Sequence, residues 1–232
     1  MDFSSKTVVI TGGTGALGSA VVSALVGAGA ACTVAYVLDD ELERFRLRGE
    51  ARVKLVKVTD LSGEADVAKL YAQQHPWASI HIAGGFAAGN VADTGKTALM
   101  AQIDGNLVSC FLCCSAAVRA MKAGGRGGRI VNVAARPALE PRLGAGMSAY
   151  TVAKSGVAAL TIALAEEVAK DGILVNAVAP SIMDTPANRK AMPKADFDTW
   201  PKVEEVAATI AFLASPDNKV TRGAVVPVYG KS

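Results

Sequence analysis

The chain has 232 residues, of which 51% are hydrophobic and 19% are charged. This length and balance are typical of one large α/β domain and exclude an intrinsically disordered chain, which would be less hydrophobic. The formal net charge is only +3 and the charges are interspersed, which excludes an extended basic surface for nucleic acid.

No targeting or membrane segment is expected. The first residues, MDFSSKTVVITGG, lack a basic stretch followed by an apolar one, and no uninterrupted apolar run is long enough to span a membrane. The basic-looking GGRGGR at 124–129 is interpreted as a glycine turn between a helix and a strand. We therefore expect a cytoplasmic protein that binds neither a membrane nor nucleic acid.

The chain contains four cysteines and two histidines, namely Cys32, Cys110, Cys113, Cys114, His75 and His81. Cys110 and Cys113 have C-x-x-C spacing, but no second pair of ligands and no neighbouring histidine accompany them in the sequence. We therefore expect small, buried, apolar cysteines and no metal site.

The expected secondary structure alternates strands with helices. Strands are expected at residues 6–12, 31–38, 52–60, 78–85, 129–135, 173–180 and 223–230. Helices are expected at residues 16–28, 39–48, 62–74, 93–122, 148–170 and 203–214. Residues 184–201 contain three prolines and break the periodicity, as a mobile substrate loop would. Alternation implies parallel pairing with right-handed crossovers, so we predict a single domain over 1–232 with a doubly wound, Rossmann-type sheet of about seven strands.

A glycine-rich turn, TGGTGALG, lies directly between the first expected strand and helix. Gly12, Gly15 and Gly18 allow a tight turn and a close approach of the backbone to a pyrophosphate. The following helix would offer free N–H groups and a favourable dipole to the same anion. This context predicts a dinucleotide site near the start of the chain.

An acidic residue after the second strand would bind the ribose hydroxyls of such a dinucleotide. Asp39 lies 21 residues beyond Gly18, which is about the expected offset. The alternative is that Asp39 is the N-cap of the following helix. No arginine occupies the turn, so the cofactor is predicted to be NAD(P)H with a preference for NADH.

Several segments, in a specific order, resemble the short-chain dehydrogenases/reductases over nearly the whole chain. They are TGGTGALG, Asp60 after the third strand, AGG at 83–85, Asn106, RIVNVAA, YTVAK and VNAVAPSIMDTP. Within that family, AGGFAAGN at 83–90 and DTPANRKAMPKADFDTW at 184–200 resemble quinoid dihydropteridine reductases. The resemblance implies an NAD(P)-dependent oxidoreductase that acts on a small molecule.

Tyr150 and Lys154 are four residues apart, so on a helix they share one face. A nearby ammonium favours the phenolate and would lower the pKa of Tyr150 from about 10, which suits a residue that exchanges a proton with substrate. The resemblance adds that Lys154 holds the nicotinamide ribose and that Asn106 supports Lys154 through a helix kink and a water. These three residues are the expected catalytic set.

The resemblance also implies a cofactor-binding set. It comprises Gly12, Thr14, Gly15, Ala16, Leu17, Gly18, Asp39, Asp60, Leu61, Ala83, Gly84, Gly85, Tyr150, Lys154, Pro180, Ile182 and Thr185. Asp60 would contact the adenine, or else cap the next helix. Thr185 would meet the cofactor's amide and phosphates, or else be a turn residue before Pro186.

Two departures from the family pattern bear on the substrate. The family usually has a serine after the fifth strand to polarise a carbonyl, but residues 133–137 read VAARP and contain no hydroxyl. Ser148 is too close to Tyr150 to replace it, and His81-Ile82 stands where the family usually has Asn-Asn. Dihydropteridine reductases also lack the serine, since their quinonoid substrate is already electron-poor.

The leading hypothesis is therefore hydride transfer to a quinonoid dihydropteridine. The alternatives are a 3-oxoacyl or other carbonyl reductase of the same family and a catalytically silent protein that senses NAD(P). Helices 93–122 and 148–170 carry apolar residues on more faces than one sheet can cover, and relatives pair these helices. We expect a homodimer or homotetramer.

Overall fold

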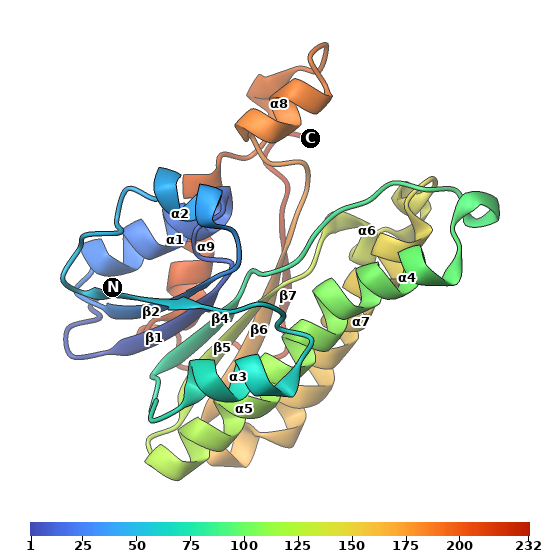
Figure 1. The fold of residues 1–232 in the computed structure, drawn as a ribbon. Coiled ribbons are helices and arrows are strands. Elements are labelled where there is room, and N and C mark those ends of the chain that lie inside the picture. Colours follow the sequence, from blue (N-terminus) through green and yellow to red (C-terminus); the bar gives the residue numbers. More distant parts are fainter.

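Seven parallel strands form the centre of the computed structural model, which describes residues 1–232 (Figure 1). Their order across the sheet is β3-β2-β1-β4-β5-β6-β7. The strands are β1 Thr7–Thr11, β2 Ala31–Tyr36, β3 Val53–Lys57, β4 Ala78–His81, β5 Gly128–Val133, β6 Ile173–Pro180 and β7 Val225–Val228. The predicted doubly wound fold is confirmed.

The strand order reverses between β1 and β4, which run side by side with Thr11 opposite His81. Chain crossovers diverge from this point in opposite directions, so the loops that follow β1 and β4 leave a crevice at the carboxyl ends of the strands. The glycine-rich turn follows β1 and the AGG segment follows β4. The topology therefore brings two distant sequence motifs to one place.

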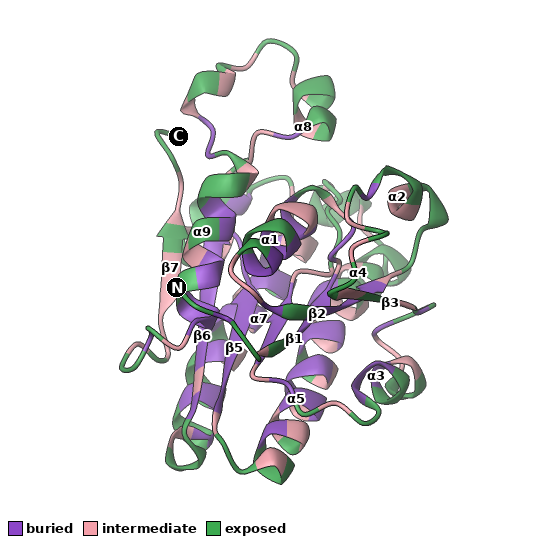
Figure 2. Ribbon diagram, turned by 90° about the vertical axis from the view of Figure 1, so that its left-hand side faces the viewer, coloured by how far each residue is buried: buried purple, intermediate pink, exposed green.

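Helices cover both faces of the sheet (Figure 2). Their bounds are α1 Ala16–Gly27, α2 Asp39–Arg44, α3 Glu64–Tyr71, α4 Lys96–Gln102, α5 Ser109–Gly124, α6 Arg136–Leu139, α7 Ser148–Glu167, α8 Pro186–Ala191 and α9 Val203–Ala214. One apolar cluster joins α1 and α9 to the sheet, and a second joins α3, α5 and α7 to its opposite face. Every residue of β5 is buried, as expected for a central parallel strand.

The long helix predicted over 93–122 is interrupted. A 3-10 turn at Val91–Asp93 precedes α4, and a π-helical segment, Ile103–Val108, separates α4 from α5. π-helical turns inside α-helices are frequent at functional sites. The candidate residue Asn106 lies in this segment.

The expectation of a loop without regular structure over 184–201 is wrong. The segment contains α8 and a 3-10 turn, Phe197–Thr199, and it projects from the carboxyl edge of the sheet (Figure 1). Its short helices were not predicted because its three prolines conceal the local periodicity. α6 and the 3-10 turn Pro141–Gly144 were missed because each is only four residues long and shows no period.

Two helical stretches are long and apolar enough for a membrane span by length and composition, contrary to expectation. They are Lys96–Gly124 and Ser148–Glu167, with mean hydropathies of 1.4 and 1.3. Core helices of soluble domains have the same composition, and both stretches contribute residues to the second apolar cluster.

Candidate active site

The backbone of the glycine-rich turn lies so close to neighbouring backbone that Gly12 and Gly18 have no room for a side chain. Gly12 has φ +64°, and a Cβ there would lie 2.8 Å from the backbone nitrogen of Ala83. A Cβ on Gly18 would lie 2.1 Å from the carbonyl oxygen of Gly12. Gly15 is the N-cap of α1 and has no side chain to occupy the helix N-terminus. The turn is therefore an open cradle of backbone N–H groups that suits a pyrophosphate.

A cleft of about 230 Å³ lies beside this turn. Seven of the predicted residues line it, from five different segments: Leu17, Gly84, Gly85, Asn106, Tyr150, Lys154 and Pro180. The structure thus brings the predicted catalytic set and part of the cofactor set together at the carboxyl edge of the sheet.

Lys154 is buried, and its Nζ donates a hydrogen bond to the carbonyl oxygen of Val133 at 2.8 Å. Asn106 is also buried, and its Nδ2 donates to the carbonyl oxygens of Gly85 and Gln102, each at 3.0 Å. A Cβ on Gly84 would lie 2.4 Å from Asn106 Oδ1 and 3.4 Å from Lys154 Nζ. The absence of a side chain at Gly84 therefore leaves room for both groups at the cleft.

The expectation that Lys154 lowers the pKa of Tyr150 is wrong for this structure. Burial raises the pKa of Tyr150 to about 12, and the ammonium does not offset it because Lys154 Nζ lies 5.9 Å from the ring centroid and bonds Val133 instead. Burial lowers the pKa of Lys154 to about 8. At neutral pH Tyr150 is protonated and can donate a proton.

The wall of the cleft beside Tyr150 is apolar. Ala134 and Ala135 line it where the family usually has its serine, and Ser148 is not among the lining residues. Phe86 packs edge-on against Tyr150, with ring centroids 5.1 Å apart. Ser181 supplies the one additional hydroxyl of the lining, and its Oγ donates to the carbonyl oxygen of Tyr229.

The roles of Phe86 and Ser181 were not predicted from sequence. Phe86 is part of the AGGFAAGN segment and is 61% exposed, which is unusual for a large aromatic residue. That exposure is visible only in the structure. Ser181 directly follows the predicted Pro180, and its position in the family motif was the one available signal.

The acidic residues after β2 are arranged differently from the prediction. β2 ends at Tyr36, and Asp39 is the first residue of α2, with Leu38 as the N-cap, so the N-cap alternative is wrong. The exposed Asp39 carboxylate forms an ion pair with Lys57 at 2.5 Å. Glu41, two residues later, instead accepts a hydrogen bond from Thr14 Oγ1 at 2.9 Å. Glu41 is thus the carboxylate that reaches the glycine-rich turn.

Asp60 follows β3 and accepts hydrogen bonds from the backbone N–H and the hydroxyl of Ser62. The helix-capping alternative is wrong, since Gly63 is the N-cap of α3. The adjacent Leu61 is buried. Asp60 therefore shapes a turn at the carboxyl edge of the sheet, and its predicted contact with an adenine stays a prediction.

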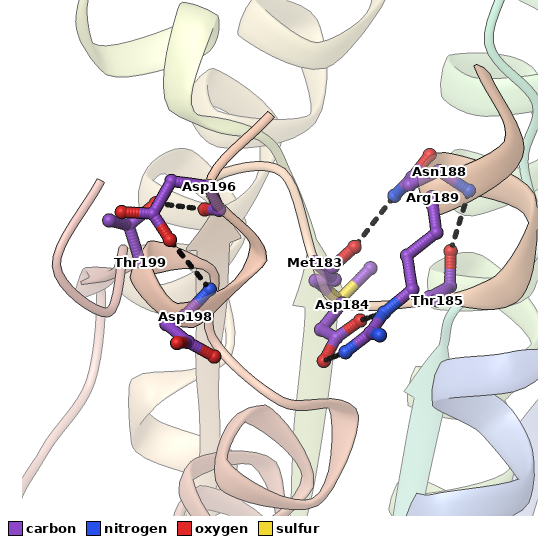
Figure 3. Close-up of polar contacts among 8 residues, drawn as sticks. All are labelled: Met183, Asp184, Thr185, Asn188, Arg189, Asp196, Asp198 and Thr199. Carbon is purple, nitrogen blue, oxygen red and sulfur yellow. Dashed lines mark hydrogen bonds and ion pairs between the residues drawn. The ribbon is translucent and has the colours of Figure 1, made fainter. Parts of the chain in front are cut away.

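Thr185 and Ile182 follow β6. Thr185 is buried and is the N-cap of α8, because its Oγ1 accepts a hydrogen bond from the backbone nitrogen of Asn188 at 3.2 Å (Figure 3). This bond uses Oγ1 as an acceptor, which agrees with a structural role before Pro186 and leaves the hydroxyl proton to be donated elsewhere. Ile182 is 44% exposed.

Contacts within the 184–202 segment stabilise its conformation (Figure 3). Arg189 forms two hydrogen bonds with Asp184, at 2.5 and 2.8 Å, and its guanidinium lies 4.7 Å from the ring centroid of Phe197. Phe197 in turn contacts Trp200, which is buried. Trp200 is thus the buried end of this chain of contacts and is placed to anchor the segment.

Comparisons with known proteins agree with this architecture. The family profile described as short chain dehydrogenase matches residues 6–196. Galactitol 2-dehydrogenase of Rhizobium johnstonii is 35% identical, over 95% of this chain and 92% of the relative. A 2,3-dihydroxy-2,3-dihydro-p-cumate dehydrogenase of Pseudomonas putida is 32% identical, over 98% and 94%.

A 3-oxoacyl-[acyl-carrier-protein] reductase of Pseudomonas aeruginosa is 29% identical, over 99% of this chain and 98% of the relative. Among solved structures, a short-chain type dehydrogenase/reductase from Mycobacterium ulcerans has a TM-score of 0.89 at 25% identity, covering 100% of this chain and 90% of that one. These matches and the site geometry agree: the chain is an oxidoreductase that belongs to the short-chain dehydrogenase/reductase family.

Proposed function

We propose that this protein is an NADH-dependent reductase whose substrate is a quinonoid dihydropteridine. The observation that carries the substrate assignment is the apolar wall at Ala134 and Ala135, beside a retained Tyr150 and Lys154. A ketone gains reactivity when its oxygen accepts hydrogen bonds from fixed donors, and this wall offers none. A quinonoid ring is electron-poor already and needs a hydride and a proton.

The residues present suit a nicotinamide dinucleotide. Gly12, Gly15 and Gly18 leave an open backbone cradle at the N-terminus of α1 for the pyrophosphate. When bound, the cofactor supplies a hydride. Tyr150, protonated at neutral pH, would donate the accompanying proton to the substrate, and Lys154 would hold the nicotinamide ribose.

The preference for NADH rests on Glu41 rather than Asp39. Glu41 hydrogen-bonds Thr14 in the glycine-rich turn, whereas Asp39 is neutralised by Lys57. A carboxylate at this turn would accept hydrogen bonds from ribose hydroxyls and would repel a 2′-phosphate. Dinucleotide choice would then follow from the charge of this one side chain.

A carbonyl reductase of the same family is the second candidate. The observation that favours it is the 29% identity to the Pseudomonas aeruginosa 3-oxoacyl-[acyl-carrier-protein] reductase, over 99% of this chain. Ser181, the remaining hydroxyl in the cleft, could donate to a substrate carbonyl only by giving up its present hydrogen bond to the carbonyl oxygen of Tyr229.

The test is a side-by-side assay of the purified protein with NADH and NADPH. Its substrates are a quinonoid dihydropterin generated in situ, ketones, 3-oxoacyl thioesters and quinones. We expect the pterin to have the highest kcat/KM. A ketone or thioester whose kcat/KM exceeds that of the pterin by about tenfold, or some 1.4 kcal/mol in transition-state binding, would favour the carbonyl reductase instead. Cofactor binding without turnover of any substrate would favour an NAD(P)-sensing protein.

A further inference from the structure

A cluster of soft metal ligands lies in the core behind the catalytic helix α7, although the sequence predicts no metal site. It consists of His81 at the end of β4 and of Cys110 and Cys114 on α5. All three side chains are buried, and their ligand atoms lie within 4.8 Å of one another. Cys110 and Cys113 have the C-x-x-C spacing in the sequence, but on α5 it is Cys114, four residues beyond Cys110, that joins Cys110 and His81 in this cluster.

The imidazole of His81 is oriented for this arrangement. Its Nε2 lies 2.9 Å from Ser79 Oγ and 3.1 Å from Tyr71 OH, so hydroxyls occupy the far side of the ring. Its Nδ1 faces Cys114 Sγ at 3.4 Å and Asn132 Oδ1 at 2.8 Å. Ligating histidines are generally fixed in this way, by a polar partner on the nitrogen that does not bind the metal.

We propose that His81, Cys110 and Cys114 form a binding site for a soft divalent cation of the zinc class. Sulfur and imidazole nitrogen are ligands that Zn²⁺ prefers, in sets of four. Asn132 Oδ1, 3.4 Å from Cys114 Sγ, is positioned as the fourth ligand. No other role in the proposed reaction uses these groups.

Charge balance favours a divalent ion. Binding would release one proton from each thiol to solvent, and the two thiolates would neutralise the ion's two charges while the imidazole stays neutral. The filled site would therefore carry no net charge, as a fully buried site requires. It would connect β4, β5 and α5 and would stabilise the fold without taking part in hydride transfer.

The first experiment uses the purified full-length wild-type protein, treated with chelator and then incubated with Cd²⁺ as a spectroscopic substitute for Zn²⁺. We expect one equivalent to bind with the ultraviolet absorption of a thiolate–cadmium bond, to be displaced by Zn²⁺, and to raise Tm. Because the ligands are buried, the incubation must be long enough for local opening. Absence of the band and of any Tm change in the folded wild type would overturn the proposal directly.

Single-residue variants would test whether the ion binds at this cluster. Cys110→Ser and Cys114→Ser should each abolish the band, whereas Cys32→Ala, a buried cysteine in the cluster on the other sheet face, should keep it. Tyr71→Phe removes a hydroxyl that orients His81 and should weaken cadmium binding about tenfold. A band that persists in the Cys110→Ser and Cys114→Ser proteins would place the ion elsewhere and would also overturn the assignment.

Discussion

At the scale of single residues, burial affects the two central titrating groups in opposite ways. It raises the pKa of Tyr150 to about 12 and lowers that of Lys154 to about 8. Tyr150→Phe should therefore leave cofactor binding intact but lower kcat by about 100-fold or more, because the proton donor is lost. Stopped-flow turnover and a cofactor titration would measure the two effects. Near-native kcat in this variant would remove Tyr150 from the mechanism.

The lowered pKa of Lys154 predicts an alkaline limit to activity. The ammonium is the charged form below a pKa of about 8, so kcat/KM should fall as pH rises through that value. Lys154→Arg should be slower at every pH, since the planar guanidinium cannot reproduce the ammonium's contacts. The same variant should lack the alkaline fall in kcat/KM, because arginine stays protonated up to about pH 12. A wild-type profile that is flat to about pH 10 would contradict this assignment.

Cofactor choice is also a property of one residue. Glu41→Gln keeps a hydrogen-bonding side chain near Thr14 but removes the charge that would repel a 2′-phosphate. Two like charges a few ångströms apart near a protein surface repel by about 1–4 kcal/mol, so the ratio of NADPH to NADH affinity should rise about tenfold or more. Asp39→Asn is the matched control and should leave the ratio unchanged, since Lys57 already neutralises Asp39. Fluorescence titration with both dinucleotides measures the ratio.

At the scale of elements, the agreement between sequence and structure depended on length and burial. β6 was predicted at its observed bounds because ILVNAVAP is a continuous apolar run between turn residues. The π-helical interruption at Ile103–Val108 was not predicted, because the helical spacing of apolar residues continues through it. α6 and α8 are too short to show a period.

Some residues of the candidate site were likewise predicted from the sequence and others were not. Tyr150, Lys154 and Asn106 were found because a sequence motif specifies them, and the cleft contains all three. Glu41 and Phe86 were missed because only tertiary packing determines that their side chains point toward the site. The cluster of His81, Cys110 and Cys114 was missed because His81 is distant from the cysteines in the sequence and meets them only where α5 packs against β4.

The 184–202 segment yields a prediction about an element. Trp200 is buried and contacts Phe197, so it should fix the segment to the body of the protein. Trp200→Ala should lower the free energy of unfolding by about 3 kcal/mol, as deletion of a large buried side chain does. Phe86→Ala is the comparison, because Phe86 is exposed, and it should change the free energy of unfolding by less than about 0.5 kcal/mol. Urea denaturation measures both, and equal effects would mean that Trp200 is not an anchor.

At the scale of the whole molecule, α5 and α7 present apolar side chains to solvent on the side away from the sheet. Phe111 on α5 is 54% exposed, and Val152 and Ile162 on α7 are 55% and 51% exposed. Their exposure on two neighbouring helices creates an apolar surface of the kind that marks a protein–protein interface. We therefore predict a homodimer or homotetramer formed through these helices.

Light scattering after gel filtration at micromolar concentration should give at least twice the chain mass of 23.7 kDa. Ile162→Arg places a charge on this surface and should yield monomers, because an unpaired charge is costly to bury in an apolar interface. Leu38→Arg is the control. Leu38 is 57% exposed and is the N-cap of α2, which packs beside β2 rather than against α5 or α7, so this variant should keep the parent mass. A wild-type protein that elutes as a fully active monomer would contradict the prediction, and an Ile162→Arg protein of unchanged mass would assign the interface to another surface.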